Sequence, residues 1–195
     1  MDKPVFVDFG CGPNVKQLLK YRKKGYYVIM VDRSEEDLYE NTDIQDIEYY
    51  KLIADEISFF DITDISKRTT YKADVWNCAA VLEHIEPDQV DLFLTGIKNS
   101  CKKGSRGSMY IDLTDHFGGF DHRVNPEKYS HFIKNIYTES DWYDIIEKHF
   151  EIKKWYRRIK SDITPDDPTF VRTLKNKWQK YSSHNCFSVL FILNT

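Results

Sequence analysis

Residues 4–14 read Pro-Val-Phe-Val-Asp-Phe-Gly-Cys-Gly-Pro-Asn. The apolar residues at the start of this stretch predict a buried strand over 4–9, and a helix is expected from Val15. Between them, Gly10 and Gly12 permit a tight turn and let the backbone approach a ligand closely. A glycine turn that opens a helix presents unpaired backbone N–H groups at one point. The stretch therefore predicts a strand–turn–helix unit with a ligand site at the turn.

A second apolar run, over 26–32, ends in an acidic residue. Asp32 follows Gly12 by about 20 residues, the spacing at which a carboxylate accepts hydrogen bonds from both hydroxyls of a ribose. The alternative is a solvated carboxylate at the end of a strand. Because two glycines precede it, we favour the ribose and expect a nucleoside-containing cofactor.

Strand and helix patterns alternate along the chain, as is typical of a parallel sheet with helices on both faces. Strands are predicted at 4–9, 26–32, 56–60, 73–78, 106–113, 150–158 and 186–193. Helices are predicted at 15–24, 35–53, 63–68, 87–101 and 138–148, with Pro87 in a first turn and Thr138 as an N-cap. We expect an α/β fold with a Rossmann-like, doubly wound, seven-stranded sheet, mostly parallel with an antiparallel last strand. Residues 1–195 are expected to form a single domain.

Composition narrows the class of protein further. The net charge of −3 gives no basic surface that would indicate nucleic-acid binding. The scattered cysteines favour buried thiols in a reducing compartment over disulfides or a zinc site; they are Cys11, Cys78, Cys101 and Cys186. No apolar run approaches the roughly 20 residues of a membrane helix, and no signal-peptide pattern is present. We expect a cytoplasmic protein with neither nucleic-acid nor membrane partners, and the sequence does not indicate its oligomeric state.

Four elements, in this order and spacing, make the chain resemble a class I S-adenosylmethionine-dependent methyltransferase of the small-molecule type. They are Val-Asp-Phe-Gly-Cys-Gly (7–12), Val-Asp (31–32), Phe-Asp-Ile (60–62), and the segment 74–85 that ends in Val-Leu-Glu-His-Ile. The resemblance covers about residues 4–115 well and the rest loosely. It implies S-adenosyl-L-methionine as cofactor and a small molecule as methyl acceptor.

The resemblance also implies which residues bind the cofactor. Asp8 would lie near its ammonium group, Asp32 would hold the ribose, and Asp61 would accept a hydrogen bond from the adenine amine. The full set of expected cofactor-binding residues is Asp8, Gly10, Cys11, Gly12, Asp32, Arg33, Asp61, Ile62, Asn77 and Cys78.

Several of these positions have structural alternatives. Asp8 could orient the glycine turn through its backbone N–H groups, and Asp61 could cap a helix. We interpret Glu83 and His84 as residues that organise the loop and helix after the fourth strand, and Trp76 as a core residue.

The densest ionisable cluster follows the fifth predicted strand, within 111–122. Ligands of open α/β sheets bind beyond the carboxyl ends of the strands, so His116 is a candidate general base there, with Asp115 or Asp112 orienting its ring. The alternative is a polar surface loop whose Asp and His residues cap turns. His116, Asp121 and His122 match no recognised metal-ligand spacing, so no metal is expected.

Two segments, 114–137 and 159–185, are expected to act as lids. The second contains basic and aromatic residues that could bind an acidic substrate. However, Phe170, Leu174, Trp178 and Tyr181 recur at helical spacing, which favours an amphipathic helix.

The sequence therefore predicts methyl transfer from S-adenosylmethionine to a small molecule, with oxygen preferred over nitrogen as the accepting atom. Residues 115–117 resemble methyltransferases that act on surface polysaccharides and other glycans, which favours a sugar-like acceptor. One alternative is a methyltransferase-like domain that binds without turnover. A nicotinamide-dependent dehydrogenase is a weaker alternative, since its usual motif needs glycine where Val15 stands.

Overall fold

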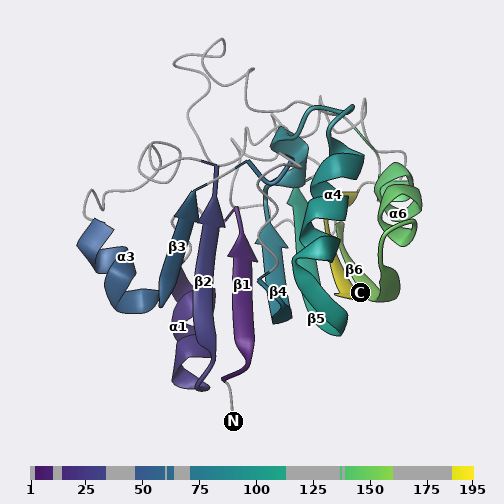
Figure 1. The fold of residues 1–195 in the computed structure, drawn as a ribbon. Helices are drawn as coiled ribbons and strands as arrows, with labels where there is room; N and C mark the ends of the chain where they lie inside the picture. Colours follow the sequence, from purple (N-terminus) through teal and green to yellow (C-terminus); the bar gives the residue numbers. More distant parts are fainter. Residues whose placement is uncertain are drawn as a thin grey trace, which may run out of the picture.

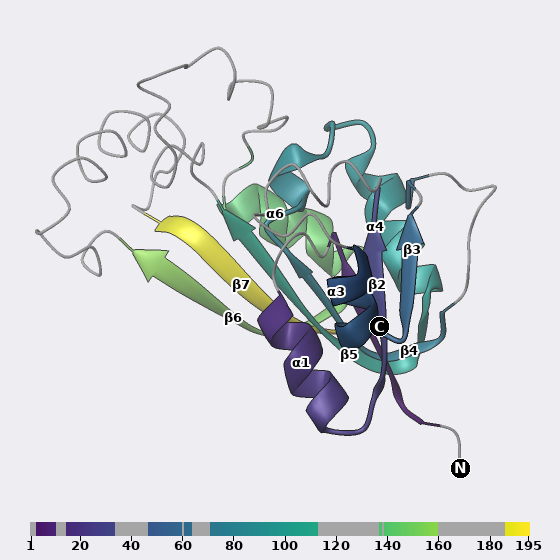
Figure 2. The ribbon, with the colours of Figure 1, turned by 90° about the vertical axis from the view of Figure 1, so that its left-hand side faces the viewer.

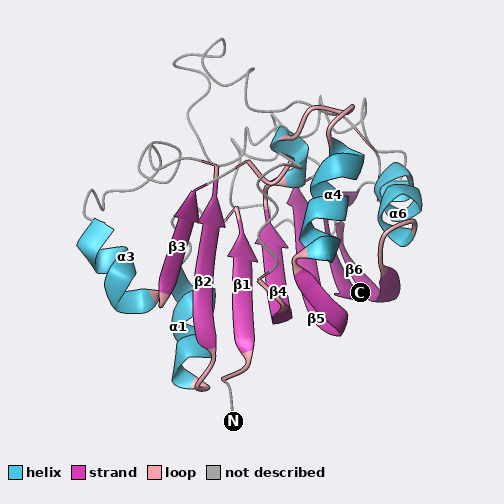
Figure 3. Ribbon diagram, viewed as in Figure 1, coloured by secondary structure: helices cyan, strands magenta, loops and turns pink. Residues whose placement is uncertain are grey.

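The computed structural model describes residues 3–10, 15–33, 47–59, 61–63, 71–112, 137, 139–159 and 186–195. These residues form a seven-stranded sheet in the order β3-β2-β1-β4-β5-β7-β6 (Figure 1). The strands are β1 (Val5–Phe9), β2 (Tyr27–Asp32), β3 (Glu56–Phe59), β4 (Ala73–Ala79), β5 (Cys101–Asp112), β6 (Glu151–Ile159) and β7 (Cys186–Asn194). The helices are α1 (Val15–Lys23), α3 (Ile47–Ile53), the short 3-10 helix η2 (Leu82–His84), α4 (Val90–Asn99) and α6 (Glu139–Glu147), shown in cyan in Figure 3.

The strand directions confirm the predicted topology. The pairs β2–β3, β1–β2, β1–β4 and β4–β5 are parallel, whereas β7 lies antiparallel between β5 and β6. The strand order reverses between β1 and β4, and at such a switch point the loops after the two strands diverge to opposite faces. The fold therefore places a crevice at the carboxyl ends of β1 and β4.

Helices cover both faces of the sheet (Figures 1 and 2). On one face, Val7 and Phe9 of β1 share a buried cluster with Phe93 of α4. On the other face, Phe6 packs with Leu18 of α1. Alternate residues of β1 thus enter different halves of the core, as expected for a strand buried on both sides.

The fourth predicted helix (87–101) extends too far, and the fifth predicted strand (106–113) begins too late. α4 ends at Asn99, and Cys101 begins β5 by pairing with Ala73 of β4. The register then shifts before Arg106 pairs with Val75, and Gly104 adopts a φ of +78° within this irregular part of the strand. Gly104 therefore lies within the strand, at the irregularity in its pairing with β4.

Pro87, expected in the first turn of the fourth predicted helix, instead lies in the turn that precedes Val90, outside α4. Gly107 lies in β5 directly against the indole of Trp76, where a Cβ atom would lie 1.9 Å from the indole Cε2. Trp76 is 1% exposed, as predicted for a core residue. Thr138 and the predicted helix beyond Thr63 lie outside the described residues.

Among the described residues, no helix combines the length and the apolar character needed to span a membrane.

Candidate functional site

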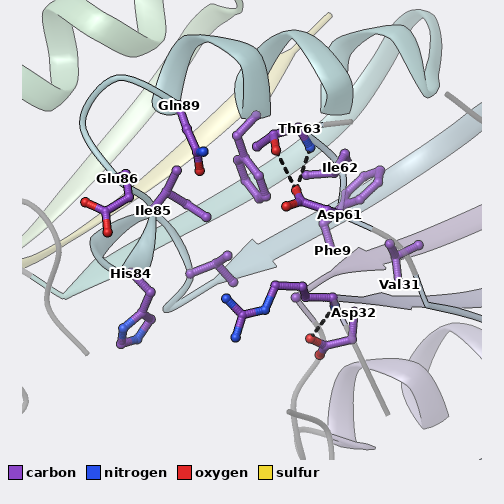
Figure 4. Close-up of a pocket in the computed structure, with 14 residues that line it drawn as sticks. Phe9, Val31, Asp32, Asp61, Ile62, Thr63, His84, Ile85, Glu86 and Gln89 are labelled. Atoms are coloured by element: carbon purple, nitrogen blue, oxygen red, sulfur yellow. Dashed lines mark hydrogen bonds between the residues drawn. The ribbon is translucent and has the colours of Figure 1, made fainter. Parts of the chain in front are cut away.

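A pocket of about 230 Å³ lies at the carboxyl edge of the sheet, at the switch point (Figure 4). Its lining comes from the ends of β1 and β2, from the turn after β3, and from the segment between β4 and the middle of α4. The lining residues are Phe9, Gly10, Val31, Asp32, Arg33, Asp61, Ile62, Thr63, Val81, His84, Ile85, Glu86, Gln89 and Phe93. The segments that converge here are those in which the sequence predicted cofactor-binding residues.

Gly10 begins the turn after β1 in a conformation that favours glycine. Its φ is +64°, and its N–H donates to the carbonyl oxygen of Val31 at 2.8 Å. A Cβ atom at position 10 would lie only 2.3 Å from Cγ2 of Val81. Because residue 10 has no side chain, the turn after β1 can pack against Val81, which follows β4, at the pocket wall. This is a second reason for glycine here, besides the close approach of a ligand expected from the sequence.

The end of β2 contributes a carboxylate. Asp32 is half-buried and lines the pocket together with Arg33. Oδ1 of Asp32 accepts a hydrogen bond from the backbone N–H of Arg33 at 2.8 Å. This contact fixes the carboxylate at the strand end, where it faces the pocket.

The turn after β3 combines the two roles considered for Asp61. Its Oδ1 accepts hydrogen bonds from the N–H of Thr63 at 2.9 Å and from its hydroxyl at 2.7 Å, so Asp61 caps this turn. It also lines the pocket next to Ile62. α4 packs closely on this turn because residue 96 is glycine: a Cβ atom there would lie 2.6 Å from the carbonyl oxygen of Ile62.

The segment after β4 supplies the opposite wall, and here the sequence analysis missed pocket residues. Glu83 is 2% exposed, in line with a structural role, but its neighbour His84 is half-buried and lines the pocket. Figure 4 shows His84 and Glu86 across the pocket from Asp32 and Asp61. The 3-10 turn of η2 brings His84 to the pocket while burying Leu82 and Glu83, an orientation that the strand-then-helix pattern did not predict.

Three of the expected cofactor-binding residues lie outside the lining, in the sheet beneath it. The amide Nδ2 of Asn77 donates to Oδ1 of Asp8 at 2.8 Å, and both side chains are buried. Burial raises the pKa of Asp8 to about 7, against the lowering effect of the Asn77 hydrogen bond, and the nearby Asp32 carboxylate raises it further. Burial also raises the pKa of the Cys78 thiol, so this cysteine is a core residue with little thiolate character.

The structure thus brings Gly10, Asp32, Arg33, Asp61 and Ile62 together around one pocket, with Asp8, Asn77 and Cys78 below it. Cys11, Gly12, Asp115 and His116 lie outside the described residues, as do most of the two predicted lid segments. Within the described part of the chain, no cluster of three or more His, Cys, Asp or Glu residues could hold a metal ion.

Comparison with solved structures identifies the fold. A SAM dependent methyltransferase from Archaeoglobus fulgidus matches 99% of this chain and 86% of its own, with a TM-score of 0.60 and 15% identity. Geranyl diphosphate C-methyltransferase from Streptomyces coelicolor A3(2) matches 98% of this chain and 73% of its own, with a TM-score of 0.65 and 13% identity. 1,6-Didemethyltoxoflavin-N1-methyltransferase from Burkholderia thailandensis matches 99% of this chain and 72% of its own, with a TM-score of 0.63 and 13% identity.

The Streptomyces and Burkholderia enzymes were both solved with S-adenosylhomocysteine. No protein-family model matches the sequence, and no curated protein matches it either. At these low identities, the structural matches show that the chain shares the fold of these methyltransferases, and they show the fold alone.

Proposed function

We propose that this protein is a methyltransferase that transfers a methyl group from S-adenosylmethionine to a small molecule. The observation that carries the proposal is the pocket at the switch point, where Asp32 and Asp61 follow neighbouring strands and Gly10 forms the adjacent turn. The fold of the chain is consistent with this function, because structures of the same fold include methyltransferases solved with the demethylated cofactor.

The chemistry of the pocket lining fits this cofactor. Asp32 is an acceptor for the two ribose hydroxyls, and Asp61 is an acceptor for the adenine amine. Apolar side chains such as Ile62 and Phe93 offer a surface for the adenine ring. We therefore assign the nucleoside to the walls formed by the ends of β2 and β3 and by α4.

Charge separates this assignment from the dehydrogenase alternative. Among the described residues of the lining there are three carboxylates, those of Asp32, Asp61 and Glu86, and one guanidinium, that of Arg33. A negative pocket suits a cofactor with a sulfonium and an ammonium group, whereas it would repel the diphosphate of a nicotinamide cofactor.

When bound, S-adenosylmethionine supplies an electrophilic methyl group on its sulfonium. The chain must then align the acceptor in line with that group and exclude water. A hydroxyl acceptor must also lose a proton, which calls for a general base near the pocket. An amine acceptor of low pKa is already neutral and needs no such base. A general base near the pocket would therefore favour methyl transfer to oxygen over methyl transfer to nitrogen.

We infer that His116 is this base, with Asp115 orienting its ring, and that the acceptor is an oxygen atom of a sugar or glycan precursor. β5 brings the chain to the pocket edge of the sheet at Asp112, four residues before His116 in the sequence. A second candidate base is His84, which is favoured by its place in the pocket lining. Its imidazole is across the pocket from Asp32 and could face an acceptor (Figure 4).

Calorimetric titration with S-adenosylhomocysteine tests the cofactor assignment, with NADH and NADPH as controls. We expect micromolar binding of S-adenosylhomocysteine alone. Binding of the nicotinamide cofactors alone would instead support the dehydrogenase alternative.

A methyl-transfer screen tests the catalytic part of the proposal, with sugars and sugar nucleotides as acceptors and S-adenosylmethionine carrying a labelled methyl group. Once an acceptor is found, His116→Gln should lower kcat while the affinity for S-adenosylhomocysteine is unchanged. If His84→Gln has that effect instead, the base is His84. Cofactor binding with no transfer to any hydroxyl or amine acceptor would favour the non-catalytic alternative.

A further inference from the structure

Beneath the pocket, three polar side chains form a row across neighbouring strands. Asp8 of β1 is directly paired with Asn77 of β4, which is paired with Ser108 of β5. The Ser108 hydroxyl donates to Oδ1 of Asn77 at 2.8 Å, and Nδ2 of Asn77 donates to Oδ1 of Asp8 at 2.8 Å. An ionised carboxylate only accepts hydrogen bonds, so the Asn77 amide presents its N–H group to Asp8, and the Ser108 hydroxyl, which can donate or accept, donates to the amide oxygen.

The row lies in a largely buried part of the sheet. Asp8 is 2% exposed and Asn77 is 7% exposed. The other ionisable groups that interact electrostatically with Asp8 are Asp32 at the end of β2, Cys78 of β4 and Tyr21 of α1. Among the described residues, no Lys, Arg or His forms an ion pair with Asp8.

The row is connected to the pocket through Asp32. The Asp8 side chain projects from β1 on the opposite face to Phe9, and its carboxyl group interacts electrostatically with that of Asp32, which lines the pocket. A positive charge placed in the pocket would favour the ionised carboxylate, because opposite charges interact strongly where little water separates them.

We propose that Asn77 and Ser108 are positioning residues that hold the Asp8 carboxyl group beneath the pocket, and that this group releases a proton to solvent when the cationic cofactor binds. The inference rests on the proposed function, which supplies the cation. It is supported by the pKa of Asp8, which burial raises to about 7, so the carboxyl group is largely protonated at pH 6 and largely ionised at pH 8.5.

The coupling has a definite sign. Below pH 7 the cofactor must displace the proton, so affinity rises with pH, by at most about tenfold per pH unit for a single linked proton. Above that range the carboxyl group is already ionised, and its contribution to the pH dependence disappears. Binding at pH 6 should therefore release up to about one proton, and binding at pH 8.5 almost none from this group.

Calorimetry with S-adenosylmethionine, in two buffers of different ionisation enthalpy, measures this proton directly. We expect wild-type protein to release more protons at pH 6 than Asp8→Asn does, and the difference to vanish at pH 8.5. Because the titration of the cofactor's own amino group is common to both proteins, the comparison removes it. Equal proton release by the two proteins at pH 6 would overturn the inference and leave the proposed function intact. Failure of the wild-type protein to bind at all would contradict the proposed function and the coupling together.

The positioning role is tested in the free protein, without any cofactor, by carboxyl ¹³C NMR titration. Asn77→Ala removes the hydrogen bond that lowers the pKa of Asp8, so the pKa should rise above its wild-type value. Ser108→Ala should shift it in the same direction by less, and Ser108→Thr, which retains the hydroxyl, should restore the wild-type titration. A pKa that is the same in wild type and in Asn77→Ala would overturn the positioning role.

Discussion

Two groups of polar residues near the pocket differ in their contact with solvent. We call Asp8, Asn77 and Ser108, which lie in the sheet and outside the lining, the floor, and we call the lining residues Asp32, Asp61, His84 and Glu86 the rim. Floor residue Asp8 is 2% exposed, whereas Asp61 and Glu86 on the rim are exposed. The Asp8 carboxyl group accepts a hydrogen bond from the side chain of Asn77, while the Asp32 and Asp61 carboxylates accept hydrogen bonds from backbone N–H groups.

This difference implies different functions for similar side chains. An exposed or half-buried carboxylate is ionised at little cost to folding and can bond directly to a ligand. Burial disfavours the ionised form of a carboxyl group. It therefore destabilises the folded protein at any pH at which the same carboxyl group is ionised in the unfolded chain. The rim is suited to recognition and the floor to sensing the charge of what is bound.

Asp8→Asn should give the largest effect, on the pH dependence of stability. The folded protein keeps the Asp8 proton up to about pH 7, whereas an unfolded aspartate loses it near its ordinary value of 3.8. Between these pH values the folded state binds more protons, so this group lowers stability as pH rises. The loss amounts to about 4 kcal/mol, since one pKa unit corresponds to about 1.4 kcal/mol.

Denaturant unfolding at pH 4 and pH 8 measures this loss. From pH 4 to pH 8, Asp8→Asn should lose less stability than wild type by about this amount. The exposed turn residue Asp88 offers a control, because Asp88→Asn removes a carboxylate without removing a buried one. Equal pH dependence for wild type and Asp8→Asn would remove the distinction between floor and rim.

Gly10→Ala should destabilise the protein by about 3 kcal/mol, combining left-handed strain of about 1–2 kcal/mol with overpacking of about 1–3 kcal/mol. The added methyl group would meet Val81 at 2.3 Å. Gly25 has a φ of +84° with nothing within 4 Å of an added Cβ, so Gly25→Ala isolates the strain.

Thermal unfolding compares these variants with the double variant Gly10→Ala/Val81→Ala. We expect the double variant to recover part of the loss, because it removes the two Val81 methyl groups that the added Cβ would contact. Equal losses in Gly10→Ala and Gly25→Ala would show that Val81 does not set the requirement for glycine at the pocket wall.

Asp32→Ala should weaken S-adenosylhomocysteine binding by about 100-fold, since hydrogen bonds to a charged group contribute about 1.5–3 kcal/mol each. It also removes the smallest of the three effects on the pKa of Asp8, so the loss of stability with rising pH should decrease by much less than in Asp8→Asn. Calorimetry gives the affinity and denaturant unfolding gives the stability. A large stability loss with unchanged affinity would place Asp32 among the structural residues.

Thr63→Val should have the smallest effect, about threefold on the same affinity, because it removes one of two donors that orient the Asp61 carboxylate and leaves the carboxylate free to bond to the ligand. It removes the hydroxyl that donates to Asp61 at 2.7 Å but keeps the backbone donor. Asp61→Ala removes the whole carboxylate, so its loss of affinity in the same titration is the largest that Thr63→Val could cause by acting through Asp61. A Thr63→Val effect larger than that of Asp61→Ala would contradict the idea that Thr63 acts through Asp61.

The rim was more predictable from the sequence than the floor. Asp32 and Asp61 follow apolar strands directly, so local patterns were sufficient to place both at the carboxyl edge. The Asn77–Asp8 bond joins residues 69 positions apart, and it depends on the register between β1 and β4, which local patterns do not contain. His84 was missed for a related reason, since the orientation of a single 3-10 turn decides whether it faces the pocket or the core.

A crystal structure with S-adenosylhomocysteine tests the central claim most directly. The account predicts electron density for the ribose hydroxyls at the Asp32 carboxylate, with the adenine between the Asp61 turn and α4. Density for the ligand elsewhere on the protein, or an empty pocket in crystals soaked at saturating concentration, would contradict it.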